Sequence, residues 1–188
     1  MSHLHVLPAN LPAPLDDGAA AHLPGLRLPP VVLACTDGKH YALNDFSAPT
    51  VLVVYPMTGQ PDQPLPTGWD TIPGARGCTP QLCSLRDHQP AWATLGVQLF
   101  GLSVQSHAEQ LEAKHRLQLP FECLSDETGQ LAQALALPTF CADQRTFYRR
   151  LTLICQQGRI SQVMYPIFPP DQHVHQLLAF LQTHPFST

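Results

Sequence analysis

Hydrophobic residues along the chain recur with the periods of strands and helices in alternation. Val51–Tyr55 is a continuous apolar run, typical of a central strand covered on both faces, and Val97–Val104 predicts the next strand. Residues 106–117 begin with the Ser-x-x-Glu pattern of a capping box, which predicts a helix. Asp126–Leu135 predicts another helix, and the apolar spacing over 174–181 predicts an amphipathic C-terminal helix.

Two pairs of short apolar segments predict hairpins. Val31–Ala34 and Tyr41–Leu43 flank Asp37-Gly38, a standard turn signal. Leu151–Gln156 and Ile160–Tyr165 are joined by a Gln-Gly turn. Because strands alternate with helices and then pair through a hairpin, we expect an α/β fold whose mixed sheet has helices on both faces.

Two proline-rich segments interrupt this pattern. Residues 1–24 predict an extended arm over the surface, ahead of one domain over 25–188. Within the domain, 57–75 contains four prolines and three glycines, and we interpret it as a loop inserted after the first core strand. Trp69 and Ile72 either anchor this loop over a functional site or belong to an excursion without a role.

Composition narrows the function classes. A chain of 188 residues is most simply one domain, and a net charge of -4 argues against nucleic acid as a partner. The N-terminus lacks the basic and apolar regions of a secretory signal, and no stretch approaches the roughly 20 apolar residues of a membrane span. We therefore expect a cytoplasmic protein without membrane contact. In that reducing compartment its 6 cysteines predict thiols, metal ligands or redox groups.

Candidate chemistry concentrates in the segment 74–87, GARGCTPQLCSLRD. Pro80 fits the first turn of a helix, and Thr79 before it is a plausible N-cap. Cys78 would then lie against unpaired backbone N–H groups at the positive end of the helix, beside Arg76. Both effects favour the reactive thiolate over the thiol.

The second cysteine of this segment, Cys83, follows five residues after Cys78. If both residues are helical, helix geometry separates their Cα atoms by about 9 Å. A disulfide wants less than about 7 Å, so a bond between them requires the first turn to unwind. Gly77 would let a small substrate approach the sulfur, because it has no side chain. The bland alternative is a pair of buried, inert cysteines.

The segment GCTPQLCSLRD resembles the active-site helix of the peroxiredoxins, and the five-residue spacing resembles their Q subfamily, the bacterioferritin comigratory protein type. LPPVVLACTDGKHYALNDFSAPTVLVVYP and GLSVQSHAEQLEAKHRLQLPFECLSDETGQLAQAL are similar to other parts of the same family, in family order. The resemblance covers most of residues 25–182. It implies a thioredoxin-like three-layer sandwich with an N-terminal hairpin, and an atypical two-cysteine enzyme.

The resemblance also implies residue roles. Cys78 would be the peroxidatic cysteine and Cys83 the resolving one. Arg150, in the pattern Arg150-Leu151-Thr152, would match the family's arginine, with Arg149 as the alternative. Gly77, Cys78 and Arg150 would contact the substrate.

One position departs from the family pattern. The family places a Thr hydroxyl three residues before the reactive cysteine, and here that residue is Ala75. We take Thr58, directly after the first core strand, as the candidate for the missing hydroxyl, and Thr71 as the alternative.

The reaction implied is thiol-dependent reduction of hydrogen peroxide and organic hydroperoxides. Cys78 would pass through a sulfenic acid to an intrachain disulfide with Cys83, and thioredoxin or glutaredoxin would restore both thiols. No cofactor is needed, and we expect a monomer or a weak homodimer. Two rivals stay open: a protein thiol-disulfide oxidoreductase on the same fold, and a non-enzymatic peroxide-sensing binding module.

The remaining candidates have structural explanations. Four other cysteines fall on predicted strands or strand ends, where we expect buried, structural roles: Cys35, Cys123, Cys141 and Cys155. The 10 histidines show no metal-ligand spacing, so we predict no metal site. The family resemblance also implies an ion pair between Arg86 and Asp87 that positions the helix.

Overall fold

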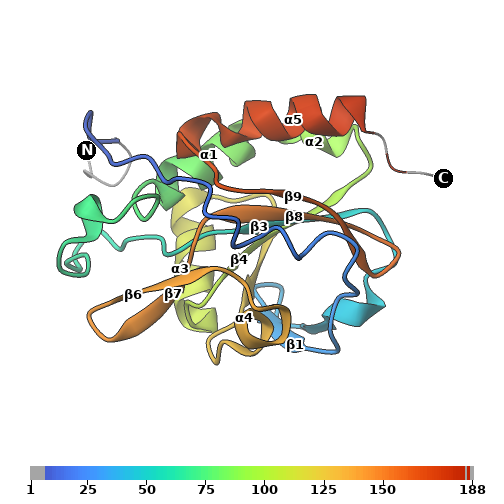
Figure 1. Cartoon of the computed structure of the whole chain (residues 1–188), viewed down its shortest axis with the longest axis horizontal. Coiled ribbons are helices and arrows are strands. Elements are labelled where there is room, and N and C mark those ends of the chain that lie inside the picture. Colours follow the sequence, from blue (N-terminus) through green and yellow to red (C-terminus); the bar gives the residue numbers. More distant parts are fainter. Residues whose placement is uncertain (1–6, 185, 187–188) are drawn as a thin grey trace.

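The computed structural model describes residues 7–184 and 186, and within them a seven-stranded mixed sheet forms the centre of the molecule (Figure 1). The strands lie in the order β2-β1-β5-β4-β3-β8-β9. β3 and β4 run parallel, as do β4 and β5, and the other pairs are antiparallel. The strands are β1 Val32–Cys35, β2 His40–Ala42, β3 Thr50–Val54, β4 Gln98–Ser103, β5 Glu122–Ser125, β8 Leu151–Gln156 and β9 Arg159–Met164.

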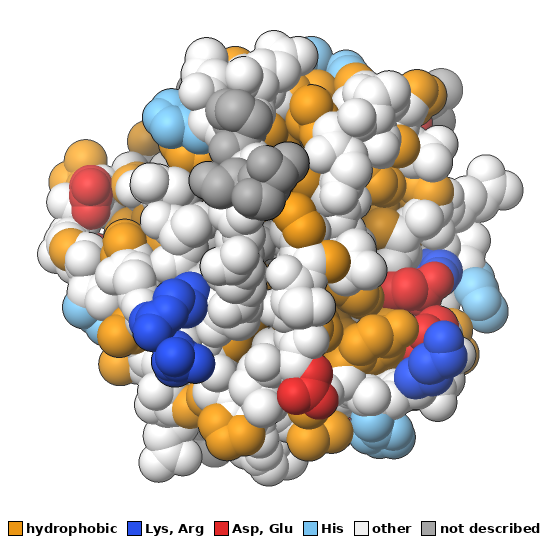
Figure 2. Space-filling model, turned by 90° about the vertical axis from the view of Figure 1, so that its right-hand side faces the viewer, with side chains coloured by type: hydrophobic (Ala, Val, Ile, Leu, Met, Phe, Trp, Pro, Cys, Tyr) orange, Lys and Arg blue, Asp and Glu red, His pale blue; other side chains and the backbone are white. Residues whose placement is uncertain are grey.

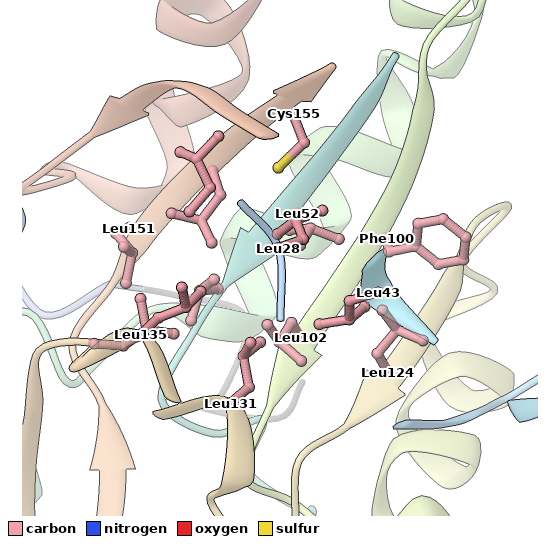
Figure 3. Close-up of a cluster of buried hydrophobic side chains, with 14 of the residues drawn as sticks. Leu28, Leu43, Leu52, Phe100, Leu102, Leu124, Leu131, Leu135, Leu151 and Cys155 are labelled. Carbon is pink, nitrogen blue, oxygen red and sulfur yellow. The ribbon is translucent and has the colours of Figure 1, made fainter. Parts of the chain in front are cut away.

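The central strand β3 separates two hydrophobic cores. Its side chains alternate, so Val51 and Val53 belong to the core that lies against α1 and α5, whereas Leu52 and Val54 belong to the opposite core. Figure 3 shows Leu52 in that second core, among side chains from neighbouring strands and from α4. A strand buried on both faces explains the continuous apolar run in its sequence.

Helices cover both faces of the sheet, as expected. α1, α2 and α5 lie together in Figure 1, and buried residues of α3 join the same core, whereas α4 packs on the other face. The capping box at Ser106 is present, with its hydroxyl accepting from the Glu109 N–H and the Glu109 carboxylate accepting in return. The bounds are α1 Cys78–Asp87, α2 Gln89–Ala93, α3 His107–Leu117, α4 Gln130–Leu135 and α5 His173–Thr183, with short 3-10 helices η2 Leu43–Asp45, η3 Trp69–Thr71 and η4 Pro170–Gln172.

The structure corrects one helix boundary. The predicted helix over 126–135 begins only at Gln130, because Gly129 takes a left-handed conformation as its N-cap. The buried carboxylate of Asp126 instead accepts hydrogen bonds from the N–H groups of Leu131 and Ala132, and from the hydroxyl of Tyr148. A polar residue that caps from outside thus replaces the first helical turn.

A third hairpin, which was not predicted from the sequence, lies outside the central sheet. β6 Thr139–Ala142 and β7 Arg145–Tyr148 form a two-stranded sheet of their own. Its turn contains Asp143 and Gln144, both with positive φ, and no glycine signals it. Cys141 lies on β6 and is exposed, so our prediction of a buried structural role for it is wrong.

The inserted segment, residues 57–75, packs on the β6–β7 hairpin. Trp69 of η3 is buried, with its ring edge-on to Phe147 at a centroid distance of 4.9 Å and near Phe140 at 5.6 Å. Asp143 in the hairpin turn accepts a hydrogen bond from the Thr67 N–H. Trp69 therefore anchors the insertion, which lies beside the N-terminal end of α1 in Figure 1.

The N-terminal segment follows the edge of the sheet. The Gly25 N–H donates to the Ile160 carbonyl, and the Ile160 N–H donates to the Leu26 carbonyl. Residues 25–26 therefore pair along β9. Leu23 is fully buried although it belongs to the predicted arm over 1–24, and residues 1–6 of that arm lie outside the described part. The boundary at residue 24 stays a prediction.

Charged groups are sparse on the surface. On the face drawn in Figure 2, the few Lys, Arg, Asp and Glu side chains lie singly or in small groups among hydrophobic and uncharged side chains. Over residues 7–184, no helix is long and apolar enough to cross a bilayer.

Candidate active site

Cys78 is the first residue of α1 and is only 2% exposed. The N-cap is Gly77, in a left-handed conformation with φ of 102°, and no side chain caps the helix. Thr79 is therefore not the N-cap, and that prediction is wrong, whereas Pro80 does lie in the first turn. Cys78 lies where backbone N–H groups have no intrahelical acceptor.

Two donors from distant parts of the chain point at the Cys78 sulfur. Arg150 Nη2 lies 3.3 Å from Sγ, and the backbone N–H of Met57 lies 3.4 Å from it. The thiol itself can donate to the carbonyl of Ala75 at 3.7 Å. Both donors stabilise negative charge on the sulfur.

Arg150 is held firmly in this position. Its Nη2 also donates to the carbonyl oxygens of Gly74 and Arg76 at 3.2 and 3.0 Å, and its Nη1 donates to the side-chain oxygen of Gln81. The residue is 3% exposed and immediately precedes β8. Its Nε–H has no hydrogen-bond partner among the described residues. Of the two adjacent arginines, Arg150 is the one whose guanidinium contacts the sulfur, whereas Arg149 is half-buried.

A small pocket of about 10 Å³ opens beside Cys78. A volume of this size has room for about one water-sized molecule. Its lining includes Met57, Gly59, Leu65, Trp69, Arg76, Gly77, Cys78 and Thr79. Met57, Gly59 and Leu65 also line an adjoining pocket of about 310 Å³ between the insertion and the β6–β7 hairpin. The cysteine therefore lies at the narrow end of a wider hollow.

Gly77 lines the small pocket, but the reason for a glycine at this position differs from the one that we expected. A Cβ at this position would stand 2.4 Å from Cγ of Pro170 and 2.9 Å from Cδ2 of Leu7. The chain itself fills the space that we assigned to an approaching substrate. Glycine is required here for its positive φ and for this close packing.

Neither predicted hydroxyl contacts the Cys78 sulfur. The Thr58 hydroxyl donates to Gln105 Oε1 at 3.0 Å, and the Thr71 hydroxyl donates to the Gly68 carbonyl at 2.7 Å. The Thr58 backbone is also tied to Gln105, which fixes the loop carrying the Met57 N–H. The hydroxyl residue that lines the pocket is Thr79, whose role we had limited to helix capping.

Cys83 lies on the same helix in different surroundings. It is half-buried against the core beneath α1 and α5, and burial raises the pKa of its thiol, partly offset by the charge of Arg86. Arg86 and Asp87 form the predicted ion pair at 2.8 Å, and Arg86 also donates to the Leu117 carbonyl. Both thiols are free, and α1 is intact between them.

Sequence reasoning missed a buried polar network behind Arg150. Gln81 contacts Arg150 on one side and His173 on the other, and His173 contacts Thr152. In the sequence, the histidines were weighed as possible metal ligands. The one available signal was a glutamine on the same face of the helix as Leu82 and Leu85, because a buried amide needs polar partners.

Three of the other cysteines are buried. Burial raises the pKa of Cys35 to about 11, and of Cys123 and Cys155 to about 12, as suits structural cysteines. Within residues 7–184 no cluster of three or more His, Cys, Asp or Glu side chains could hold a metal ion.

Comparisons with known proteins show which family the chain resembles. The redoxin family model matches residues 23–181. Peroxiredoxin Q, chloroplastic, from Oryza sativa subsp. japonica is 27% identical over 161 residues, which cover 85% of this chain but only 66% of the rice protein. Peroxiredoxin Bcp from Bacillus subtilis is 26% identical over 163 residues, covering 84% of this chain and 94% of that protein.

A solved structure shares the fold. Peroxidoxin BcpB from Mycobacterium tuberculosis superposes with a TM-score of 0.68 at 21% identity, covering 87% of this chain and 99% of that one. Its likeness supports the thioredoxin-like architecture of the mixed sheet. The chain therefore belongs to the redoxin family, and the curated relatives that it resembles are peroxiredoxins of the Q and Bcp type.

Proposed function

We propose that this chain is a thiol-dependent peroxidase that reduces hydrogen peroxide and organic hydroperoxides through Cys78. The observation that carries the proposal is the sulfur's environment, with Arg150 Nη2 at 3.3 Å and the Met57 N–H at 3.4 Å. Donors that stabilise negative charge favour the thiolate, which is the nucleophilic form of cysteine. The resemblance to the peroxiredoxins supports the same chemistry.

In the first step the Cys78 thiolate attacks one peroxide oxygen. A sulfur–oxygen bond forms, the oxygen–oxygen bond breaks, and the leaving oxygen takes the electron pair and then a proton, becoming water or an alcohol. Cys78 becomes a sulfenic acid. Arg150 supplies preorganised donors for the developing charge, and its unpartnered Nε–H is a buried donor that a polar ligand could satisfy. Thr58 contributes by anchoring the loop that presents the Met57 N–H.

Two pocket sizes support the substrate range. The space of about 10 Å³ beside Cys78 suits a peroxide group and little else. The adjoining 310 Å³ has a mixed lining. Met57, Leu65, Pro64 and Pro66 supply apolar contacts that suit the alkyl part of an organic hydroperoxide, and Glu109, Asp143 and Arg145 line it as well.

In the second step Cys83 attacks the sulfenic sulfur of Cys78, forming the disulfide and releasing water. Since an intact helix keeps the two Cα atoms about 9 Å apart, the first turns of α1 must unwind. Unwinding also removes the burial that keeps Cys83 in its thiol form. A dithiol reductant of the thioredoxin or glutaredoxin type then restores both thiols by exchange. We retain the cytoplasm as the compartment and a monomer or weak homodimer as the form.

The test is a product analysis after one equivalent of hydrogen peroxide. Mass spectrometry should find a Cys78–Cys83 disulfide in the wild type, no specific oxidation in Cys78→Ser, and sulfenic or overoxidised Cys78 in Cys83→Ser. Cys141→Ser is the matched control, because Cys141 is the exposed thiol among the six and should not alter the products. A disulfide to Cys141, or equal oxidation in all four proteins, would contradict the assignment.

Turnover separates this function from its two rivals. A peroxidase consumes peroxide repeatedly when a thioredoxin system is supplied. A protein thiol-disulfide oxidoreductase would instead reduce or exchange protein disulfides without consuming peroxide, and a sensor would be oxidised once without efficient turnover.

A further inference from the structure

Four polar side chains form a continuous buried chain behind the Cys78 sulfur. Arg150 Nη1 donates to Gln81 Oε1, Gln81 Nε2 lies 3.0 Å from His173 Nδ1, and His173 Nε2 lies 3.0 Å from the Thr152 hydroxyl. Gln81, His173 and Thr152 are each 0% exposed. The chain joins α1, the start of β8 and the first residue of α5, three elements that are distant in sequence.

The chemistry of arginine sets the direction of every hydrogen bond in this chain. Arg150 can only donate, so Gln81 must turn its oxygen toward Arg150 and its NH₂ toward His173. His173 Nδ1 must then accept, which leaves the ring proton on Nε2 for donation to Thr152. A proton on Nδ1 would place two donors against each other and favour a flipped Gln81, with its NH₂ facing the guanidinium.

The surroundings keep His173 neutral. Burial, together with the charge of Arg150, lowers its pKa to about 3. Gln81 faces it from α1, and Thr152 faces it from β8. A neutral ring with one accepting and one donating nitrogen is what the hydrogen-bond directions require.

We propose that His173 is a positioning residue for the peroxide reaction, which acts through Gln81 to hold Arg150 against the Cys78 sulfur. The inference rests on the proposed function, because it assigns His173 a part in the same reaction. His173 touches neither sulfur nor pocket. Its effect is to lock the amide of Gln81 in the one orientation that accepts from the guanidinium.

The position of Gln81 gives the network a second consequence. Gln81 lies between Cys78 and Cys83, on the segment that has to unwind before the disulfide forms. The network is therefore complete only while the helix is closed. It positions Arg150 for the first step and is dismantled in the second.

The experiment compares His173→Leu with His173→Asn. Leucine has a side chain of similar size to histidine but lacks the accepting nitrogen Nδ1. Gln81 can then flip, and Arg150 loses its fixed position. Asparagine can present an oxygen near the position of Nδ1, so it should keep Gln81 oriented toward Arg150. We expect the second-order rate of Cys78 oxidation by hydrogen peroxide to fall on the order of 10-fold to 100-fold in His173→Leu. The rate in His173→Asn should stay within a few-fold of the wild type.

Two readouts distinguish positioning from general destabilisation. The rate of Cys78 alkylation by uncharged iodoacetamide should fall much less than the peroxide rate in His173→Leu, because alkylation does not use the Arg150 donors for a leaving oxygen. His175→Leu, on the exposed side of the same helix, is the matched control and should leave both rates unchanged. A folded His173→Leu protein that reacts with peroxide at the wild-type rate would overturn the inference.

A measurement on the unmodified protein covers the case in which His173→Leu does not fold. Nitrogen NMR of labelled histidine should find His173 neutral between pH 5 and 8, with its proton on Nε2. A proton on Nδ1, or a charged ring in this range, would refute the network. Absence of peroxide reduction in the wild type would defeat the proposed function instead, so the two failures remain distinguishable.

Discussion

Cys78 and Cys83 occupy the same helix, yet the protein surrounds them in opposite ways. Cys78 is 2% exposed and receives donors from Arg150 and Met57. Cys83 is half-buried against apolar side chains, and burial raises its thiol pKa. Both thiols share one short stretch of sequence, so the difference between their surroundings comes from tertiary partners such as Arg150 and Met57.

The difference also divides the proposed reaction in two. The N-terminal end of α1 is built to hold charge at one fixed place, whereas the region around Cys83 favours a neutral thiol until the helix opens. Peroxide reduction would depend on the donors around Cys78, and disulfide formation on the stability of the intervening turn. Substitutions can therefore change one step without the other.

The largest effect is expected from Arg150→Met, which removes the guanidinium donors beside Cys78 and leaves the surroundings of Cys83 unchanged. Removing a preorganised donor from a developing oxyanion costs on the order of 10²-fold to 10³-fold in rate. The second-order rate of Cys78 oxidation, followed by rapid mixing with hydrogen peroxide, should fall by that amount.

Arg149→Met is the matched control for this loss. Arg149 is the adjacent arginine, and its backbone N–H donates to the Pro138 carbonyl, which the substitution leaves in place. Its peroxide rate should stay near that of the wild type. Equal losses at both positions would show that net charge, rather than the contact with sulfur, controls the reaction.

An intermediate effect is expected from Gly77→Ala, at the N-terminal end of α1. The positive φ and the contacts with Pro170 and Leu7 both oppose a side chain at this position. We expect a loss of about 1–3 kcal/mol in the free energy of unfolding, measured in urea, with a slower reaction of Cys78.

Gly96→Ala separates the two causes of that loss. Gly96 has a positive φ of 67° but no atom within 4 Å of an added Cβ. It therefore reports backbone strain alone and should cost less than Gly77→Ala. If the two substitutions cost the same, close packing at Gly77 contributes nothing.

The smallest effect is expected from Pro80→Gly, which sharpens the comparison on the side of Cys83. Glycine raises the conformational freedom of the opened segment, so unwinding should become easier by about 1 kcal/mol. Disulfide formation should accelerate about fivefold, an amount that follows from about 1.4 kcal/mol per factor of ten. Quenched-flow mass spectrometry can time it.

The first step provides the internal control for Pro80→Gly. The oxidation of Cys78 to sulfenic acid should keep its rate, because the contacts from Arg150 and Met57 do not involve the Pro80 side chain. Slower disulfide formation in this variant would argue that the helix does not have to open.

The sequence alone determined features that depend on neighbouring residues. The Asp37-Gly38 turn, the apolar run of β3 and the capping box at Ser106 all act within a few residues, and each appears in the structure. The same holds for the location of the two cysteines on one helix, with Cys78 at its start.

The family resemblance assigned Arg150 to the site of Cys78, but only the tertiary structure decided which other groups meet at the sulfur and behind it. The Thr58 hydroxyl turns to Gln105, Gln81 bridges Arg150 to His173, and the β6–β7 turn is held by a contact from the insertion to Asp143. The physical reason is that a buried polar group takes whichever partner the packing of distant elements brings within reach. Local sequence pattern specifies helices and strands through short-range sterics and periodicity. It does not predict which distant polar groups will become hydrogen-bond partners.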